Sequence, residues 1–90
     1  MDFEWDEQKA SANVLKHQVT FDEAKTVFDD PLFVYYLDTL HSDTEDRYII
    51  LGRSAAKRLL TVCYTERHGK TRLISARKAT ARERLDYQEG

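Results

Sequence analysis

The stretch LLTVCYTERHGKTRLISAR, residues 59–77, decides the fold of this chain because it predicts two strands joined by a tight turn. Residues 59–66 and 71–77 alternate apolar with polar side chains, which is the period of two that a half-buried strand shows. Residues 68–70 between them have the length and the glycine of a hairpin loop. We expect two neighbouring antiparallel strands here.

The length of the turn decides which side chains share a face of this sheet. A three-residue loop places Tyr64 opposite Ile74, so that the apolar side chains of both strands lie together. The opposite face then holds hydroxyl, thiol and guanidinium groups, namely Thr61, Cys63, Thr65, Arg67, Thr71, Ser75 and Arg77. A two-residue loop places Leu73 opposite Tyr64 and sends Arg67 and Arg77 to opposite faces. We expect the first register.

Two more strands and a loop come before this hairpin. Residues 32–37 and 47–53 are rich in β-branched and aromatic side chains, which favours strands. The polar residues 38–46 between them predict a loop. Residues 3–5 have the composition of a very short strand.

Two helices are predicted near the N-terminus. Asp6 is placed as the N-cap of a helix over residues 7–17. A capping box at residues 20–23 (TFDE) starts the second helix, with an apolar face at helical spacing. The second helix ends before Pro31, because a residue that precedes proline avoids the helical conformation.

A last helix completes the predicted order of elements. A second capping box at residues 80–83 (TARE) starts it, and it ends at Gly90. The order is therefore (β)ααββββα. Helices that are separate from a run of adjacent strands predict an α+β fold with an antiparallel sheet.

Composition indicates one folded domain over residues 1–90. The chain has a mass of 10.6 kDa, and its 41% of apolar and 11% of aromatic residues are too many for a disordered chain. Its longest apolar run, residues 32–37, is far shorter than the ~20 residues that span a bilayer. The start, MDFEWD, is acidic where a signal peptide is basic. We expect a cytoplasmic protein with no membrane partner.

The net charge of −2 hides a strong asymmetry between the halves of the chain. Residues 1–46 carry three basic and twelve acidic side chains, whereas residues 47–90 carry eleven basic and four acidic ones. Such a split indicates either an anionic partner for the basic half or neutralisation of one half by the other across the fold. The sequence leaves both open.

No cofactor and no metal are expected. His17, His41 and His68 are widely spaced, and the HExxH, CxxC and EF-hand patterns are missing. The three glycines are not grouped into a phosphate-binding loop. The single Cys63 excludes an internal disulfide, and its place inside a strand is typical of a small face-lining residue.

The basic residues around the two hairpin strands suit RNA cleavage without a metal. That reaction needs a base for the 2′-hydroxyl proton, a cation for the pentavalent phosphorane and an acid for the leaving 5′-oxygen. Arginine suits the second role because its planar fork binds two phosphate oxygens. Glu66 is the candidate base, and Arg67 and Arg77 form the candidate phosphate clamp. Lys78 and Tyr87 are the candidate acids.

Other arginines are candidates for binding the RNA backbone, namely Arg47, Arg53, Arg72 and Arg82. Each of these charges also has a plainer interpretation as a solvated residue at the end of an element. The plainer interpretation of Tyr87 is a residue that packs against its neighbours. Spacing alone leaves these alternatives open.

A series of short motifs follows in order along nearly the whole chain. They are FEWD (3–6), KH (16–17), VTFDEA (19–24), VFDDP (27–31), HS (41–42), LGRS (51–54), YTER (64–67), ISARKA (74–79), ER (83–84) and YQE (87–89). As an ordered set they resemble the BrnT family of toxins, in the RelE-like superfamily of bacterial type II toxin–antitoxin systems.

The resemblance implies a RelE-like fold and an endoribonuclease that arrests translation. It also implies neutralisation by a ribbon-helix-helix antitoxin of the BrnA type, with operator DNA bound only through the antitoxin. In RelE-like enzymes catalysis rests on basic residues of the central strands and sometimes on a tyrosine of the last helix. Here these positions correspond to Arg67, Arg77, Lys78 and Tyr87. Glu66 belongs to the matching Thr-Glu-Arg motif.

One residue departs from the family pattern. Gln18 stands where glycine is expected after the Lys-His pair. If this residue ends the first helix in a left-handed conformation, the cost is about 1 kcal/mol.

Two alternatives to the nuclease acting on free RNA stay open. The first is a non-catalytic module that binds the antitoxin and acts as a co-repressor. The second is an mRNA interferase that depends on the ribosome to align the message.

Overall fold

A computed structural model describes residues 1–89, and its elements follow the predicted order. They are β1 Phe3–Glu4, α1 Glu7–His17, α2 Phe21–Ala24, the 3₁₀ helix η1 Lys25–Asp29, β2 Val34–Leu37, β3 Arg47–Arg53, β4 Leu59–Arg67, β5 Lys70–Lys78 and α3 Ala81–Glu89. The second predicted helix is split, because its last part tightens into a 3₁₀ helix before Pro31. The predicted end of the last helix at Gly90 lies outside the described residues. None of the described helices is long and apolar enough to cross a bilayer.

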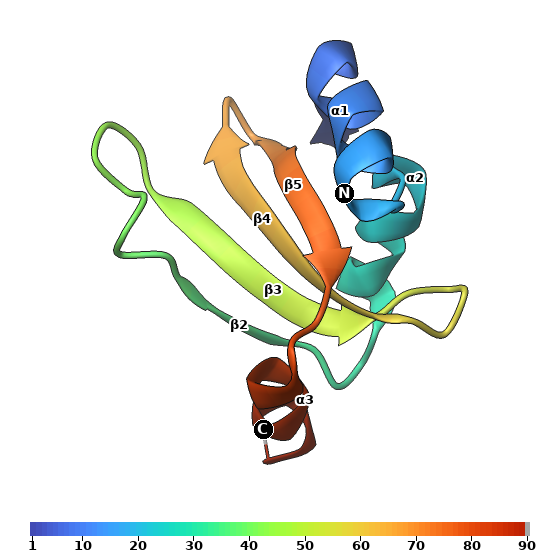
Figure 1. Cartoon of the computed structure of the whole chain (residues 1–90). Coiled ribbons are helices and arrows are strands. Elements are labelled where there is room, and N and C mark those ends of the chain that lie inside the picture. The colour runs from blue at the N-terminus through green and yellow to red at the C-terminus, as the bar shows by residue number, and fades with distance from the viewer. Residues whose placement is uncertain (90) are drawn as a thin grey trace.

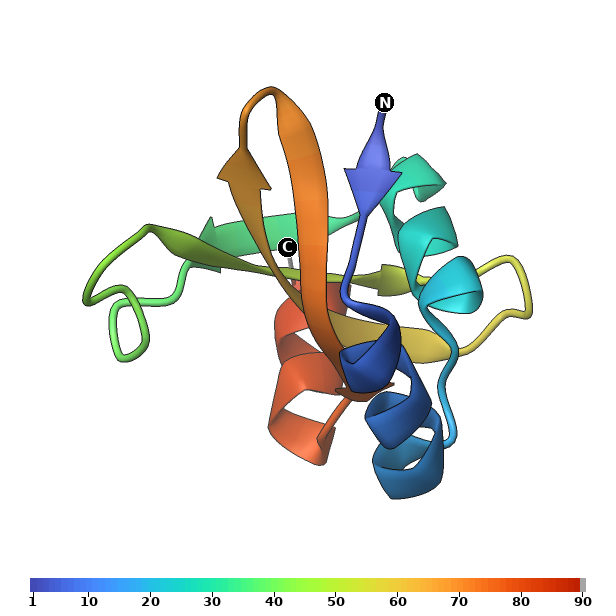
Figure 2. The ribbon, with the colours of Figure 1, turned by 90° about the horizontal axis from the view of Figure 1, so that it is seen from above.

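The strands form one five-stranded sheet in the order β1-β5-β4-β3-β2. Strands β2 to β5 pair antiparallel with their neighbours along the chain, as predicted. Strand β1 lies parallel to β5 at the edge, with Phe3 opposite Thr71 (Figure 2). The predicted α+β class is confirmed, and the parallel edge makes the sheet mixed.

The turn between β4 and β5 has two residues and not the expected three. Both His68 (φ 53°) and Gly69 (φ 78°) have positive φ angles, which is typical of a type I′ turn. The twist of such a turn matches that of paired strands. Tyr64 therefore lies opposite Leu73, and the predicted pairing of Tyr64 with Ile74 is wrong.

A β-bulge restores the predicted faces farther along this hairpin. Ile74 is the extra residue that β5 inserts at this point. Beyond it, Ala76 lies opposite Val62 and Arg77 lies opposite Thr61, as in the predicted register. The register of a two-residue loop therefore holds between the turn and the bulge, and the predicted register holds beyond the bulge.

Helices α1 and α2 lie together along one side of the sheet, where the core forms (Figure 1). The core consists of Val19, Phe21, Ala24, Val27, Ile50, Leu60, Val62, Tyr64, Leu73 and Ala76. Helix η1 approaches β3 closely at Gly52, because a Cβ atom there would lie 3.0 Å from Val27 Cγ1.

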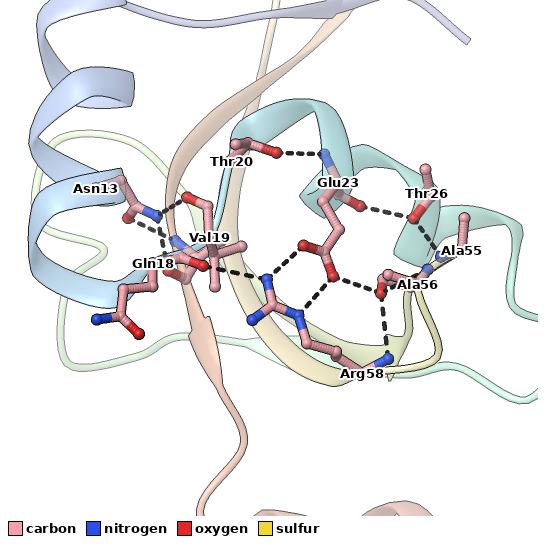
Figure 3. Close-up of polar contacts among 11 residues, drawn as sticks. Asn13, Gln18, Val19, Thr20, Glu23, Thr26, Ala55, Ala56 and Arg58 are labelled. Atoms are coloured by element: carbon pink, nitrogen blue, oxygen red, sulfur yellow. Dashed lines mark hydrogen bonds and ion pairs between the residues drawn. The ribbon is translucent and has the colours of Figure 1, made fainter.

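Asn13 is a buried polar residue that ties α1 to the sheet (Figure 3). Its side-chain amide donates hydrogen bonds to the carbonyls of Val19 (2.8 Å) and Ala76 (2.9 Å) and accepts one from the Ala76 N–H (3.0 Å). Ala76 immediately precedes Arg77. This contact therefore fixes the part of β5 that carries Arg77.

Glu23 does not complete the capping box that the sequence predicts. The Thr20 hydroxyl accepts a hydrogen bond from the Glu23 N–H (3.0 Å), but the Glu23 carboxylate does not return to Thr20. It turns instead to the loop between β3 and β4, where it accepts from Ser54 Oγ (2.6 Å) and Arg58 Nε (2.9 Å) (Figure 3). These bonds pin the loop to α2 and lower the pKa of Glu23.

Helix α3 lies apart from α1 and α2, beyond the end of β5 (Figure 1). It starts with the reciprocal capping box that the sequence predicts. The Glu83 N–H donates to Thr80 Oγ1 (3.2 Å), and the Thr80 N–H donates to Glu83 Oε1 (2.8 Å). None of the described α3 side chains is fully buried.

Candidate active site

The face of the sheet that α1 and α2 leave open contains a cavity of about 260 Å³. Thr61 pairs with Arg77, and Cys63 pairs with Ser75, so these side chains share the face opposite the core. The cavity is lined by Asp38, His41, Arg47, Ile49, Thr61, Cys63, Ile74, Ser75 and Arg77. Strands β3, β4 and β5 form its floor, and the loop before β3 supplies the first two of these residues.

Arg77 is held in the cavity by an acidic residue of α3. Its Nη1 lies 2.7 Å from Glu83 Oε1, and its Nη2 lies 3.0 Å from Oε2, which is a two-pronged ion pair. Glu83 also accepts a hydrogen bond from the Thr61 hydroxyl (3.0 Å). The ion pair raises the pKa of Arg77, which therefore stays charged at all ordinary pH values.

Glu83 carries a fixed negative charge as a result. Burial by itself raises the pKa of this carboxyl group, but hydrogen bonds from Arg77, the Thr80 N–H and the Thr61 hydroxyl outweigh burial and lower the pKa to about 2. Only 13% of the Glu83 side chain is exposed. Helix α3 is thus linked electrostatically to the candidate site.

Arg47 is the second cation of the cavity, and part of it has no partner. Its Nε is buried and makes no hydrogen bond within residues 1–89. Its backbone is well fixed, because its N–H donates to Ser42 Oγ (3.0 Å) and its carbonyl accepts from the Asp38 N–H (2.7 Å). A buried donor without a partner costs about 1–3 kcal/mol, so a shift of the Arg47 side chain that lets Nε donate to an anion in the cavity is favourable.

His41 and Asp38 form a hydrogen-bonded pair at the rim of the cavity. His41 Nδ1 lies 2.9 Å from Asp38 Oδ2. The His41 side chain is 64% exposed, whereas that of Asp38 is 13% exposed. The buried carboxylate therefore orients an imidazole that remains open to solvent.

Reasoning from the sequence missed this pair. His41 and Asp38 stand three residues apart in a loop that has no apolar periodicity, and a chemical role for His41 was considered only as a metal ligand. The available signal is local: an Asp-x-x-His spacing directly before a strand that begins with Arg47.

The cysteine in the cavity is not activated. Burial raises the pKa of the Cys63 thiol, and the nearby Asp38 charge adds to that rise. A thiol in such surroundings remains protonated at neutral pH. This agrees with a face-lining role.

Arg67 lies on the same face as Arg77 but at the other end of β4. It follows Thr61, which faces Arg77, by six residues, or about 20 Å along a strand. Its Nη2 contacts both carboxylate oxygens of Glu45, at 3.0 and 2.9 Å. The structure does not bring together the two arginines of the predicted clamp.

Glu66 lies on the opposite face of the sheet from Arg77. It pairs with Thr71, whose hydroxyl donates to the Glu66 carboxylate (3.2 Å), and it lines a different, apolar hollow beside Tyr64. The expected place of Thr71 on the arginine face is therefore wrong, because the two-residue turn shifts the pairing near it.

The two candidate acids do not line the cavity. Lys78 pairs with Leu60 at the end of β5 and is exposed. The Tyr87 hydroxyl donates to Asp30 Oδ2 (2.6 Å), and this hydrogen bond, with burial, raises the pKa of Tyr87. Tyr87 thus links α3 to the segment before β2.

Of the predicted RNA-binding arginines, only Arg47 lines the cavity. Arg53 lies over the ring of Tyr87, 5.7 Å from its centroid. Arg72 Nη1 binds Glu4 Oε2 (3.2 Å), and Arg82 Nε lies 3.5 Å from Asp86 Oδ1 on α3. These three arginines are spread over different parts of the surface.

Two comparisons with known proteins bear on this site. The model of a protein family described as "Ribonuclease toxin, BrnT, of type II toxin-antitoxin system" matches residues 5–83. The chain is also similar to the 1.1 Å crystal structure of the Brucella abortus ribonuclease toxin BrnT, with a TM-score of 0.66 and 20% identity. That similarity covers 89% of this chain and 97% of the other. The comparison with curated protein sequences gave no match.

Proposed function

Because the chain belongs to the BrnT family of ribonuclease toxins of type II toxin–antitoxin systems, we propose that it cleaves RNA in the cavity on the open face of the sheet. The observation that carries this location is the pair of arginines there. Arg77 is a fixed cation, and Arg47 keeps a buried Nε without a partner among the described residues. Both are suited to the oxygens of a scissile phosphate.

The proposed chemistry is attack of the 2′-hydroxyl on the neighbouring phosphorus. Negative charge then develops on the equatorial oxygens of the phosphorane, and positioned guanidinium groups stabilise that charge. The two arginines supply this positive charge from the protein itself, so we propose that cleavage is independent of metal. Arg67, Glu66, Lys78 and Tyr87 lie outside the cavity, and for them we propose roles away from the scissile phosphate.

The partners follow from the family. A ribonuclease toxin of a type II system has an antitoxin partner and an RNA substrate. We propose that the antitoxin has a ribbon-helix-helix domain, that operator DNA is bound only through it, and that cleavage of message inhibits translation in the cytoplasm.

The test is cleavage of free RNA in excess EDTA without ribosomes. Arg77→Ala is expected to lose about 100-fold or more of the rate, the usual effect of removing one group that stabilises transition-state charge. Arg82→Ala removes an arginine whose side chain is 84% exposed on α3 and is expected to cleave like the wild type. A folded Arg77→Ala protein with wild-type activity would contradict the proposal.

A second candidate function has one observation in its favour. The Arg77 guanidinium already has an acidic partner, Glu83, which is what a non-catalytic, antitoxin-binding module would tolerate. If the wild type fails to cleave free RNA, the same proteins are tested in a translating extract. Cleavage of message in the extract indicates a ribosome-dependent interferase, whereas the absence of cleavage favours the binding module.

A further inference from the structure

We propose that His41, oriented by Asp38, is the general acid that protonates the leaving 5′-oxygen during RNA cleavage. The inference rests on the proposed function and deepens it. It assigns the proton transfer to a pair in the loop between β2 and β3, where no catalytic group was predicted from the sequence.

The geometry of the pair suits proton transfer. The Asp38 carboxylate oxygen, 2.9 Å from Nδ1, accepts a hydrogen bond from the N–H at that position, which leaves Nε2 as the nitrogen that meets a substrate. In catalytic dyads and triads the imidazole that transfers the proton is likewise oriented by a hydrogen bond to a neighbouring group. Because Asp38 is mostly buried and His41 mostly exposed, the oriented nitrogen is accessible from the cavity.

The loop that carries the pair is fixed to the same strand as the cavity cation. Asp38 donates its N–H to the Arg47 carbonyl (2.7 Å) and accepts at its own carbonyl from Ser42 Oγ (2.5 Å). The Ser42 hydroxyl in turn accepts from the Arg47 N–H (3.0 Å). The imidazole and the guanidinium are therefore positioned by one small network.

The other titratable groups at or beside the cavity are poor proton donors near neutral pH. Arg47, Cys63 and Arg77 line it, and Tyr36 of β2 and Glu83 of α3 lie beside Arg77. Burial raises the pKa values of Tyr36 and Cys63, and the arginines keep their protons. Imidazole is the side chain that ordinarily changes charge between pH 5 and 8.

The proposed step balances as follows. The 2′-oxygen forms a bond to phosphorus and gives its proton to water, while the bond from phosphorus to the 5′-oxygen breaks and its electron pair stays on that oxygen. The Nε2 proton of His41 moves to the 5′-oxygen, and the imidazole regains a proton from solvent. The products are a 2′,3′-cyclic phosphate and a free 5′-hydroxyl.

The test uses two RNA substrates that differ in one atom. One has an ordinary scissile linkage, at a site mapped with the wild type, and the other has sulfur in place of its 5′-bridging oxygen. A thiolate leaves without protonation, so a missing general acid affects only the oxygen substrate. His41→Ala is expected to lose about 10²–10⁴-fold on the oxygen substrate and to cleave the sulfur substrate within a few-fold of the wild type.

Three variants make the result specific. Arg77→Ala is expected to lose activity on both substrates, because phosphate binding does not depend on the leaving atom. Asp38→Asn keeps the imidazole but removes the charge that orients it. Because Asp38 is a positioning residue, this variant is expected to show a shifted pH profile on the oxygen substrate and to recover its activity on the sulfur substrate. His68→Asn, in the exposed hairpin turn, is the control histidine, since asparagine tolerates its positive φ.

The outcomes separate the two proposals. Equal loss by His41→Ala on both substrates, or no loss on either, overturns the general-acid assignment while leaving the nuclease intact. A wild type that cleaves neither substrate in EDTA and no message in the translating extract overturns the proposed function, and the assignment of His41 falls with it.

Discussion

Gln18 ends α1 in a left-handed backbone conformation, with φ 59° and ψ 35°. Its N–H donates to the Val14 carbonyl, so it closes the helix where glycine is expected from the family pattern. A side chain at this conformation costs about 1 kcal/mol relative to glycine. The left-handed conformation that was considered for Gln18 from the sequence is therefore present, and its energetic cost stays a prediction.

Gln18→Gly is therefore expected to raise the free energy of unfolding by up to about 1 kcal/mol, less the extra backbone entropy of glycine in the unfolded chain. Chemical denaturation of both proteins under the same conditions measures the change. Gln8→Gly, inside α1 with ordinary helical geometry, serves as the contrast and is expected to lower stability by roughly 0.5–1 kcal/mol. Destabilisation by both substitutions would contradict the account of Gln18.

At the scale of elements, α3 depends on a few polar contacts. None of its described side chains is fully buried. Glu83 links it to the sheet by binding Arg77 and Thr61, and the Tyr87 hydroxyl links it to Asp30 in the segment before β2. The pKa of Glu83 falls from the ordinary 4.5 to about 2. A carboxylate with a lowered pKa stabilises the fold above its unfolded pKa, and this contribution is lost as the pH falls towards the folded value.

The attachment of α3 is thus expected to weaken between about pH 4.5 and 2, by an amount on the order of 3 kcal/mol. Hydrogen exchange of the α3 amides over this range measures the loss. In Glu83→Gln, the protection factors of the α3 amides, which compare their exchange with the intrinsic rate at the same pH, should be lower at neutral pH and change little between these pH values. Glu89→Gln, near the end of the same helix, should behave like the wild type.

Prediction of elements from the sequence succeeded where a local signal marks the element. The bounds of α1 and β3 agree with the structure, because the Asp6 N-cap marks the start of α1 and a run rich in β-branched and aromatic residues marks β3. The turn at residues 68–69 was missed, because a bulge lets a shorter loop satisfy the same alternation. The pair of Asp38 and His41 was missed because a loop residue's neighbours are set by the fold and not by spacing along the chain.

At the scale of the whole molecule, ion pairs join the acidic half of the chain to the basic half. They are Glu4 with Arg72, Glu23 with Arg58 and Glu45 with Arg67. Internal neutralisation therefore accounts for part of the charge asymmetry in the sequence. Arg47 is in none of these ion pairs, and what distinguishes it is that it lines the cavity and that its buried Nε has no hydrogen-bond partner among the described residues.

RNA binding is accordingly expected to depend on salt only modestly. If the two cavity arginines make the main phosphate contacts, the slope of log affinity against log salt concentration is about −1.4, at about −0.7 per contact for single strands. Titration of an uncleavable RNA at several salt concentrations measures this slope, and Arg77→Ala should halve it. An affinity that does not change with salt would contradict the placement of RNA at the cavity. A much steeper slope would show that arginines outside the cavity also bind RNA.

The bulge at Ile74 has a consequence for how the gene can change in length. Ile74 is the residue of β5 without a cross-strand partner, so loss of its codon leaves Ser75 opposite Cys63 and Arg77 opposite Thr61. Loss of codon 76 instead brings Arg77 opposite Val62, on the face of the core. Two deletions of equal size, two codons apart, thus have opposite fates under selection, and descendants with a shorter β5 should lack the former residue and not the latter.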